Sequence, residues 1–250
     1  MTSANRRIQA VIFDLDDTLI SWAEAGPWQE RSPIYFGRIY HRLAAYGCDL
    51  PDEEIFINSA LATIKRAWAE ARQTYVAPAI GTIVKTCLDY LGINYDGIDI
   101  NELLIAYGWG PVPGVKLYHD TLPLLAALRA RNYKIGLITN SALTMWMRDV
   151  EMYHYGLMPY FDARITSGDT GYIKPHPHIY QHILQLLNVQ PKEAVFVGDN
   201  PAFDILGANN AGLTSIWIDP PHLNRDLGTV KPDFTIQYPG QILSILDHLD

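Results

Sequence analysis

The stretch IQAVIFDLDDT, residues 8–18, decides the fold class of this chain. Its first six residues are mostly apolar, and they end abruptly in the acidic run that begins at Asp14. Short runs that are apolar at successive positions are typical of strands buried on both faces, as in a parallel sheet. Four more runs share this character: KIGLIT (134–139), AVFVG (194–198), SIWID (215–219) and DFTIQ (233–237).

Segments with helical spacing separate these runs. Leucines three positions apart share one face of 118–131, and isoleucines and leucines share one face of 176–188. The segment 201–212 ends in a glycine, which suits a helix C-terminus. Strands that alternate with helices predict an α/β protein with a doubly wound, Rossmann-like parallel sheet.

The region 22–109 has a different pattern, because it holds helical segments and no comparable buried strand. Its helical patterns cover 31–46, 52–72, 79–91 and 100–107. The turn-rich GWGPVPG at 108–114 then returns the chain to alternating strands and helices. The sequence therefore predicts an α/β core made of 1–20 and 111–250, with an inserted all-helical cap domain at 21–110.

Composition excludes several classes of protein. The 250 residues carry a net charge of −8, from 19 basic and 27 acidic side chains, which disfavours nucleic acid and anionic membranes as partners. We expect no membrane span and no signal peptide, since no apolar stretch is long enough. Two cysteines, Cys48 and Cys87, cannot form a disulfide framework in a chain of this length, so a cytoplasmic protein is expected. The oligomeric state stays open.

The acidic run after the first strand indicates a metal site. Along an extended segment, Asp14 and Asp16 point to the same side. Two close carboxylates repel each other unless a cation lies between them, and hard oxygen ligands favour Mg²⁺ over zinc. The alternative is that these residues merely begin a solvated loop.

Three further polar groups lie at the same predicted edge of the sheet. A parallel sheet collects ligands beyond the carboxyl ends of its strands. Taken singly, each group could be a helix cap, a surface turn or an ordinary loop. The groups are Thr139–Asn140 after the second strand, Lys174–Pro175 before a helix, and Gly198–Asp199–Asn200 with Asp204 after another strand.

These groups closely resemble, in order, the four motifs of the haloacid dehalogenase superfamily of phosphohydrolases. The matching segments are DLDDT at 14–18, LITN at 137–140, Lys174 within IKPHP, and GDNPAFD at 198–204. The resemblance covers essentially the whole chain, and the predicted cap is similar to the family's first cap type. It implies a phosphatase that acts on a small-molecule phosphate ester.

The resemblance also implies catalytic roles for individual residues. Asp14 would be the nucleophile that attacks phosphorus and becomes an aspartyl-phosphate. Asp16 would protonate the leaving oxygen and then deprotonate the attacking water. The Thr139 hydroxyl and the Asn140 backbone N–H would bind phosphate oxygens beside a helix N-terminus. Lys174 would balance the negative charge of the nucleophile and of the phosphoryl group.

The same resemblance implies a Mg²⁺ site. The metal would be held by the carboxylates of Asp14 and Asp199 and by the backbone carbonyl of Asp16. Asp204 would act one step further out, orienting Lys174 or a water molecule bound to the metal.

Three other functions remain possible on the same fold. A haloacid dehalogenase would form an alkyl ester on Asp14 without a metal, but the acid at Asp16 argues against that branch. A sugar-phosphate mutase would share the core residues and shield its aspartyl-phosphate from water. A non-catalytic binding protein would not need both aspartates. The sequence does not identify the substrate.

Some conspicuous residues favour structural roles. His176 and His178 resemble a metal pair, but no third ligand is apparent, and a capping role is expected. Lys65 in the cap is interpreted as a solvated charge rather than a Schiff-base lysine. Gly108 and Gly110 could form a hinge for cap closure, or simply a rigid turn.

Overall fold

The computed structural model describes residues 7–220 and 222–250, and an α/β sheet lies at its centre. Six strands of the described chain form one sheet, in the order β5-β4-β1-β6-β7-β8, and every neighbouring pair is parallel. The predicted doubly wound sheet is therefore confirmed. The strands are β1 (Ala10–Phe13), β4 (Lys134–Thr139), β5 (Ala163–Thr166), β6 (Ala194–Gly198), β7 (Thr214–Ile218) and β8 (Phe234–Ile236).

The central strand β1 lies between β4 and β6, and all four of its residues are buried. Phe13 at its end is in register with Leu137 on β4 and Val197 on β6. The three strands therefore end side by side. The order of strands reverses at this point, which is where open α/β sheets bind ligands.

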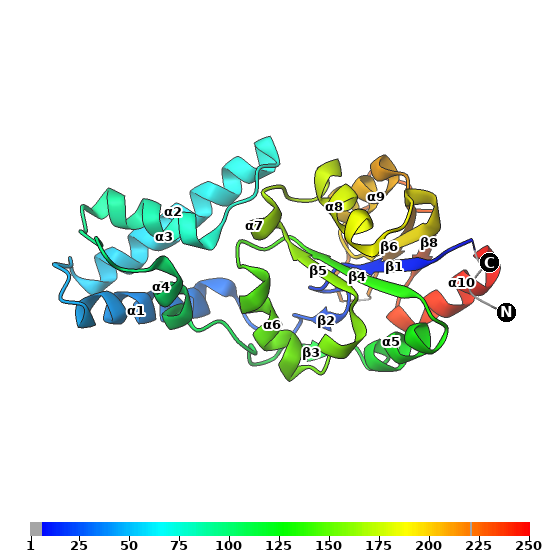
Figure 1. Cartoon of the computed structure of the whole chain (residues 1–250), viewed down its shortest axis with the longest axis horizontal. Coiled ribbons are helices and arrows are strands. Elements are labelled where there is room, and N and C mark those ends of the chain that lie inside the picture. Colours follow the sequence, from blue (N-terminus) through cyan, green and yellow to red (C-terminus); the bar gives the residue numbers. More distant parts are fainter. Residues whose placement is uncertain (1–6, 221) are drawn as a thin grey trace.

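Helices cover both faces of the sheet (Figure 1). On one face, α8 and α9 pack with β1, β4 and β6 in one apolar cluster. On the other face, α5, α6 and α10 share the second and larger cluster with the cap. The core helices are α5 (Thr121–Ala130), α6 (Met145–His154), α7 (Ser167–Thr170), α8 (Pro177–Leu187), α9 (Leu206–Ala211) and α10 (Ile242–Leu249), and a π-type turn covers Pro201–Ile205.

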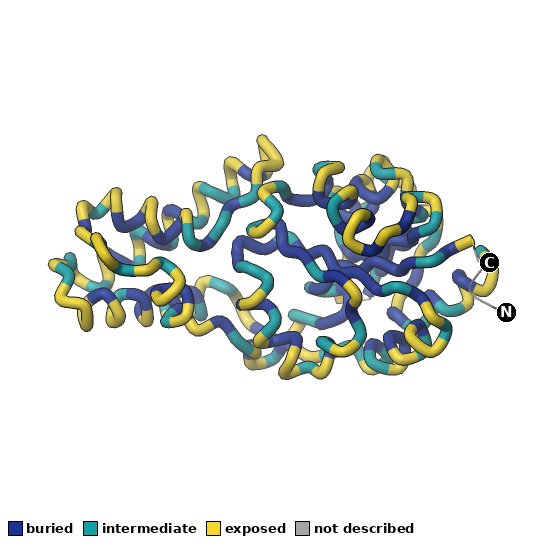
Figure 2. The backbone as a smooth tube through the Cα atoms, in the orientation of Figure 1, coloured by how far each residue is buried: buried dark blue, intermediate teal, exposed yellow. Residues whose placement is uncertain are grey.

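The predicted inserted helices form a layer beyond the sheet, drawn in blue, cyan and, for α4, green in Figure 1. Helices α1 and α2 pack against each other, and α4 and α3 pack on them. Buried residues line the inner faces of these helices and exposed residues the outer faces (Figure 2). The helices are α1 (Trp28–Ala45), α2 (Glu53–Thr74), α3 (Ile80–Leu91) and α4 (Ile100–Tyr107).

The helical layer meets the core at two places. Its two connections pair as a short antiparallel ribbon of β2 (Ile20–Ser21) and β3 (Lys116–Leu117). The segment between α2 and α3 also bonds to core loops, where the backbone N–H of Ile80 donates to the carbonyl of Ala142 at 2.8 Å. No helix in the described residues is long and apolar enough to cross a membrane.

One of the two predicted hinge glycines, Gly108, is required by the local backbone conformation. Gly108 ends α4 in the left-handed region at φ +65°, where a side chain would also approach the Arg38 guanidinium. Gly110 has no such backbone constraint, and a Cβ there would meet only Val150 at an ordinary 3.8 Å. Only Gly110 can therefore be substituted as a clean test of hinge motion.

Candidate active site

A compact turn after β1 places the first two acidic side chains. The backbone N–H groups of Leu19 and Ile20 both donate to the carbonyl of Leu15, at 2.9 and 3.2 Å. Asp17 takes the left-handed conformation, with φ +59°, that lets the chain reverse here. Asp14 is consequently buried at the end of the strand, with 6% exposure, while Asp16 lies at the surface of the turn.

Lys174 is a buried ammonium shared by two carboxylates. Its Nζ lies 2.6 Å from Asp14 Oδ1 and 2.6 Å from Asp204 Oδ1, and it also donates to the carbonyl of Ile138 at 3.1 Å. Burial alone would lower the pKa of Lys174, but the two carboxylates hold it above its usual value. Burial raises the pKa of Asp14 to about 7, with Lys174 acting in the opposite direction. Lys174 and Asp14, which the sequence analysis placed at the same edge of the sheet, are thus in direct contact.

The other two acidic side chains of the site, Asp199 and Asp204, follow strand β6. The backbone N–H of Asn200 donates to Asp204 Oδ2 at 2.9 Å, which fixes that carboxylate. Gly198 is required here, because a Cβ would lie 2.4 Å from Asp204 Cγ. Asp199 Oδ2 lies 2.5 Å from Nη2 of Arg225, and burial, followed by the charges of Asp204 and Asp14, raises the pKa of Asp199 to about 9.

The acids fit a divalent cation. Within the described residues, Asp14, Asp199 and Asp204 each offer one oxygen, and these atoms lie within 4.8 Å of one another. The buried Oδ2 of Asp199 has the Arg225 guanidinium as its ion-pair partner. Carboxylate oxygens are hard ligands of the kind that bind Mg²⁺. The side chain of Asp16 is outside this group, so its predicted part in the metal site concerns only its backbone carbonyl.

The side chain of Asp16 is held by three donors. Trp22 Nε1 donates to Oδ1 at 2.7 Å, and Arg148 Nη2 donates to the same oxygen at 2.8 Å. Thr139 Oγ1 donates to Oδ2 at 3.2 Å. These contacts fix the carboxylate at the mouth of the site, and Thr139 is thereby placed beside Asp16.

The side chain of Asn140 positions Lys174 by bonding to the backbone of Lys174. Its Oδ1 accepts from the backbone N–H of Lys174 at 2.8 Å, and its Nδ2 donates to the Lys174 carbonyl at 3.2 Å. The amide side chain is thus committed, and only the backbone N–H remains for the expected phosphate contact. The expected helix N-terminus is not adjacent, because α6 begins at Met145.

Sequence reasoning missed a buried ion network behind Asp16. Arg148 contacts Glu151 through its Nε as well as Asp16 through its Nη2, and it lies over the Trp109 ring. One guanidinium therefore faces two carboxylates. Burial raises the pKa of Glu151 to about 7, although Arg148 lowers it. The only sequence signal was the Arg-x-x-Glu spacing within α6.

The sequence did not predict two further contacts to the acids, made by Thr18 and Arg225. It did predict the role of His176 at the start of α8. Thr18 Oγ1 donates to Asp14 Oδ2 at 3.3 Å, and Arg225 approaches Asp199 from an irregular loop after β7. His176 caps α8, with its Nδ1 accepting from the backbone N–H of His178. The His176 side chain thus has the capping role expected of it, and His178 contributes only its backbone N–H.

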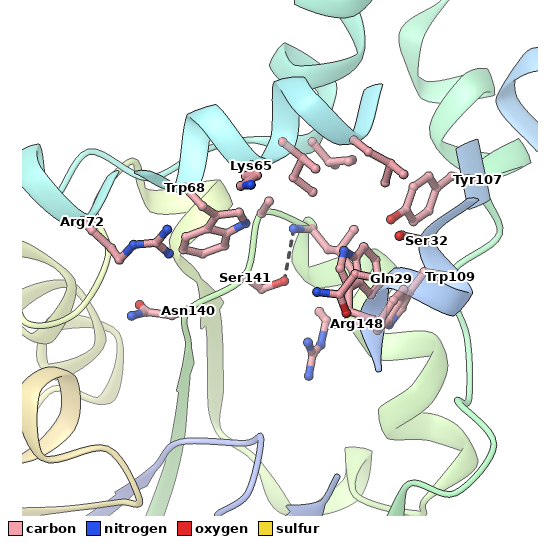
Figure 3. A pocket seen from close by; sticks show the side chains of 16 residues that line it. Gln29, Ser32, Lys65, Trp68, Arg72, Tyr107, Trp109, Asn140, Ser141 and Arg148 are labelled. Carbon is pink, nitrogen blue, oxygen red and sulfur yellow. Dashed lines mark hydrogen bonds between the residues drawn. The ribbon is translucent and has the colours of Figure 1, made fainter. Parts of the chain in front are cut away.

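A larger cavity adjoins the acidic site. The acidic cavity measures about 140 Å³, and the adjoining one measures about 610 Å³. Asn140 lines both cavities. Figure 3 shows the larger one between the cap helices and the loop that follows β4.

Fold and site define a hydrolase of a known family. Residues 8–212 match the family described as haloacid dehalogenase-like hydrolase, so the chain belongs to that family. The resemblance seen in the four motifs is confirmed.

Relatives with named activities match nearly the full chain. It is 27% identical over 250 residues to a glyceraldehyde 3-phosphate phosphatase from Methanopyrus kandleri, covering 97% of this chain and 98% of the relative. It is 28% identical over 250 residues to the pyrophosphatase PpaX of Bacillus cereus, covering 98% and 99%. These names support the predicted phosphoric monoester hydrolase.

Solved structures agree with the fold. A phosphatase of this family from Thermococcus onnurineus superposes with a TM-score of 0.62 at 26% identity, covering 96% of this chain and 98% of that one. A 2-haloacid dehalogenase from Pseudomonas syringae superposes with a TM-score of 0.69 at 25% identity, covering 97% and 100%.

Proposed function

We propose that the chain is a Mg²⁺-dependent phosphatase that removes phosphate from a small phosphorylated metabolite through an aspartyl-phosphate on Asp14. The observation that carries this proposal is the ammonium of Lys174 shared between Asp14 and Asp204, in one buried acidic cluster with the carboxylate of Asp199. The names of the relatives support the same activity class. We further propose that 1–20 and 111–250 form the catalytic domain and 21–110 the cap domain.

The metal would be held by the carboxylates of Asp14 and Asp199 and by the carbonyl of Asp16. When bound, Mg²⁺ would neutralise charge on the phosphoryl oxygens and on the acids around them. The buried oxygens of this site need such a cation, because burial disfavours their charged forms.

The side chains of the protein divide the remaining work. Asp14 attacks phosphorus while Thr18 and Lys174 hold its two oxygens in place. Lys174, which Asp204 and Asn140 orient, offsets the negative charge of the phosphoryl group. Asn140 contributes its backbone N–H to a phosphoryl oxygen.

Asp16 would carry the proton. It gives a proton to the leaving oxygen in the first step and removes one from the attacking water in the second. Trp22, Arg148 and Thr139 hold its carboxylate in a fixed orientation for both transfers. A preset orientation is valuable because proton transfer needs hydrogen-bond distances.

The test is hydrolysis of p-nitrophenyl phosphate with Mg²⁺ and with EDTA. We expect activity with Mg²⁺, none with EDTA, and full recovery on adding the metal back. Asp199→Ala should raise the Mg²⁺ concentration for half-maximal activity, whereas Asp226→Ala, which removes an exposed carboxylate, should not. Full activity in metal-free buffer, or metal-free turnover of a 2-haloacid in place of the phosphate ester, would overturn the proposal in favour of the dehalogenase reaction.

A further inference from the structure

The larger cavity has the size of a small-molecule site. Its volume of about 610 Å³ falls within the usual range of roughly 300–1,000 Å³ for ligand pockets, whereas the acidic cavity of about 140 Å³ falls well below it. Asn140 forms a wall common to both. Arg148 lines the larger cavity and reaches Asp16, which lines the smaller one. A phosphoryl group in the smaller cavity would therefore leave the rest of its ester in the larger.

Aromatic rings form much of the wall of this cavity. Trp28, Trp68, Tyr107 and Trp109 all line it, and Figure 3 shows Trp68 reaching from α2 toward the core loop. The other three pack on neighbouring rings, but Trp68 stacks on no aromatic residue of the described chain. A half-buried indole with a free face is suited to stack on a flat, apolar ligand group.

The charged side chains that line the cavity are all positive. Lys65 and Arg72 lie about one turn before and one turn after Trp68 along α2, and both line the cavity (Figure 3). Neither of them forms an ion pair with any described residue. No Asp or Glu of the described chain lines the cavity, and Arg148 is already neutralised by two carboxylates. The two free cations therefore favour an anionic ligand group.

One polar atom in the wall lacks a partner. Ser32 has no exposed surface, and its Oγ makes no hydrogen bond within the described residues. Buried hydroxyl groups almost always have a partner, and an unpaired one is costly. Ser32 lies in the wall of the cavity on the α1 side, so an unpaired hydroxyl stands directly behind the surface of this cavity.

We propose that the substrate is a phosphate monoester whose alcohol part carries a flat aromatic ring system and a second anionic group. The ring would stack on Trp68, and the anionic group would meet Lys65 and Arg72. This inference rests on the proposed phosphatase function. The proposed substrate differs from glyceraldehyde 3-phosphate and pyrophosphate, the compounds named for two relatives, because neither contains a ring.

The test is a graded series of esters. The probes are phenyl phosphate, 2-naphthyl phosphate, 6-carboxy-2-naphthyl phosphate and naphthalene 2,6-bisphosphate, compared by kcat/KM. We expect a rise of about tenfold for the second ring, as is usual for added apolar bulk in a fitted pocket. The second anion should add a further threefold to tenfold, because exposed ion pairs contribute little each, and this gain should shrink at high salt.

Variants assign each gain to its residue. Trp68→Leu should abolish the gain from the second ring, and it should lower kcat/KM for the two-ring esters more than for phenyl phosphate. Lys65→Gln and Arg72→Gln should reduce the gain from the carboxylate or second phosphate only. Arg66→Gln removes the same charge from the same helix but from a residue outside this cavity, so it should change nothing. The same order of affinities should be seen by calorimetry with Asp14→Asn, which does not depend on turnover.

Two outcomes would overturn the proposal. A wild-type enzyme that hydrolyses phenyl phosphate but shows no rise along the series has no ring or anion site in this cavity. Equal losses on every probe for Arg72→Gln and Arg66→Gln would mean a general charge effect. If no ester is hydrolysed at all, the proposed function fails, while the calorimetric series still tests the cavity on its own.

Discussion

Replacing Arg148 with methionine should leave two carboxylates, Asp16 and Glu151, without their shared cation. The arginine is 4% exposed and Glu151 is fully buried, so solvent cannot replace the cation beside Glu151, whereas the Asp16 side chain is 31% exposed and keeps some contact with solvent. Methionine keeps much of the apolar stem, which limits the cavity that the change creates. The expected result is a large loss of stability together with a misplaced Asp16.

The magnitude follows from the distance and the burial. At 2.8 Å, the Arg148–Asp16 pair has a Coulomb energy of about 6 kcal/mol at an effective dielectric constant of about 20. Much of this is offset by desolvation and by the partial exposure of Asp16. The main loss comes from the buried Arg148–Glu151 pair, because breaking a buried pair by removing one partner costs about 3–5 kcal/mol. For a chain of this size that corresponds to a fall in Tm of roughly 6–20 °C.

The pH dependence has a definite sign. Burial raises the pKa of Glu151 from its usual 4.5 to about 7, so its contribution to stability is greatest below about pH 4.5 and is lost as the pH rises through 7. Arg148 lowers that pKa, and its removal should raise it further. The loss of stability in Arg148→Met should therefore be larger at about pH 8 than at about pH 5.5.

The assay is thermal and urea unfolding at both pH values, with two comparison variants. Arg148→Met/Glu151→Leu removes both buried charges and should recover much of the loss. Arg164→Met breaks a partly exposed pair with Asp149 and should cost no more than about 1 kcal/mol. The reasoning is refuted if Arg148→Met costs no more than Arg164→Met, or if its cost is the same at both pH values.

Three further changes test neighbouring parts of the site. Arg225→Gln removes the guanidinium that faces the proposed metal site, so calorimetry should show tighter Mg²⁺ binding; weaker binding would show that Arg225 does not compete with the metal. Trp22→Phe removes one donor to Asp16 and should lower kcat about tenfold without loss of folding, and an unchanged kcat would show that this bond does not orient the acid. Gly108→Ala should destabilise the protein by about 1–2 kcal/mol because of its positive φ, whereas Gly110→Ala should fold normally and change kcat and KM together if it is the hinge. Equal stability of the two glycine variants would contradict the first part, and wild-type constants for Gly110→Ala the second.

The fold could be predicted wherever burial left a simple pattern in the sequence. Strands β1, β4 and β6 are buried along almost their whole length, so they appear as uninterrupted apolar runs. Strand β5 at the sheet edge was missed because Arg164 interrupts a run of only four residues. Helix α6 was missed because its buried face carries Arg148 and Glu151, which breaks the apolar periodicity.

The candidate site also contains residues that the sequence predicted and residues that it could not predict. The predicted acids and lysine follow strand ends or begin a helix, and parallel pairing then brings Asp14, Lys174, Asp199 and Asp204 together. Arg225 could not be foreseen, because an irregular loop carries it across to Asp199. The clamp that Asn140 forms on the lysine main chain was also unforeseeable, since it depends on the path of two loops.

The most direct test of the central claim is to trap the phosphoryl group on the protein. Wild-type enzyme is mixed with Mg²⁺ and a phosphate ester, quenched in acid within a single turnover, digested and analysed by mass spectrometry. The account predicts one added phosphoryl group on Asp14, and it predicts that Asp14→Asn folds normally, carries no such group and loses at least about a thousandfold in kcat. A phosphoryl group on another residue, or an Asp14→Asn protein with near-normal turnover, would contradict it.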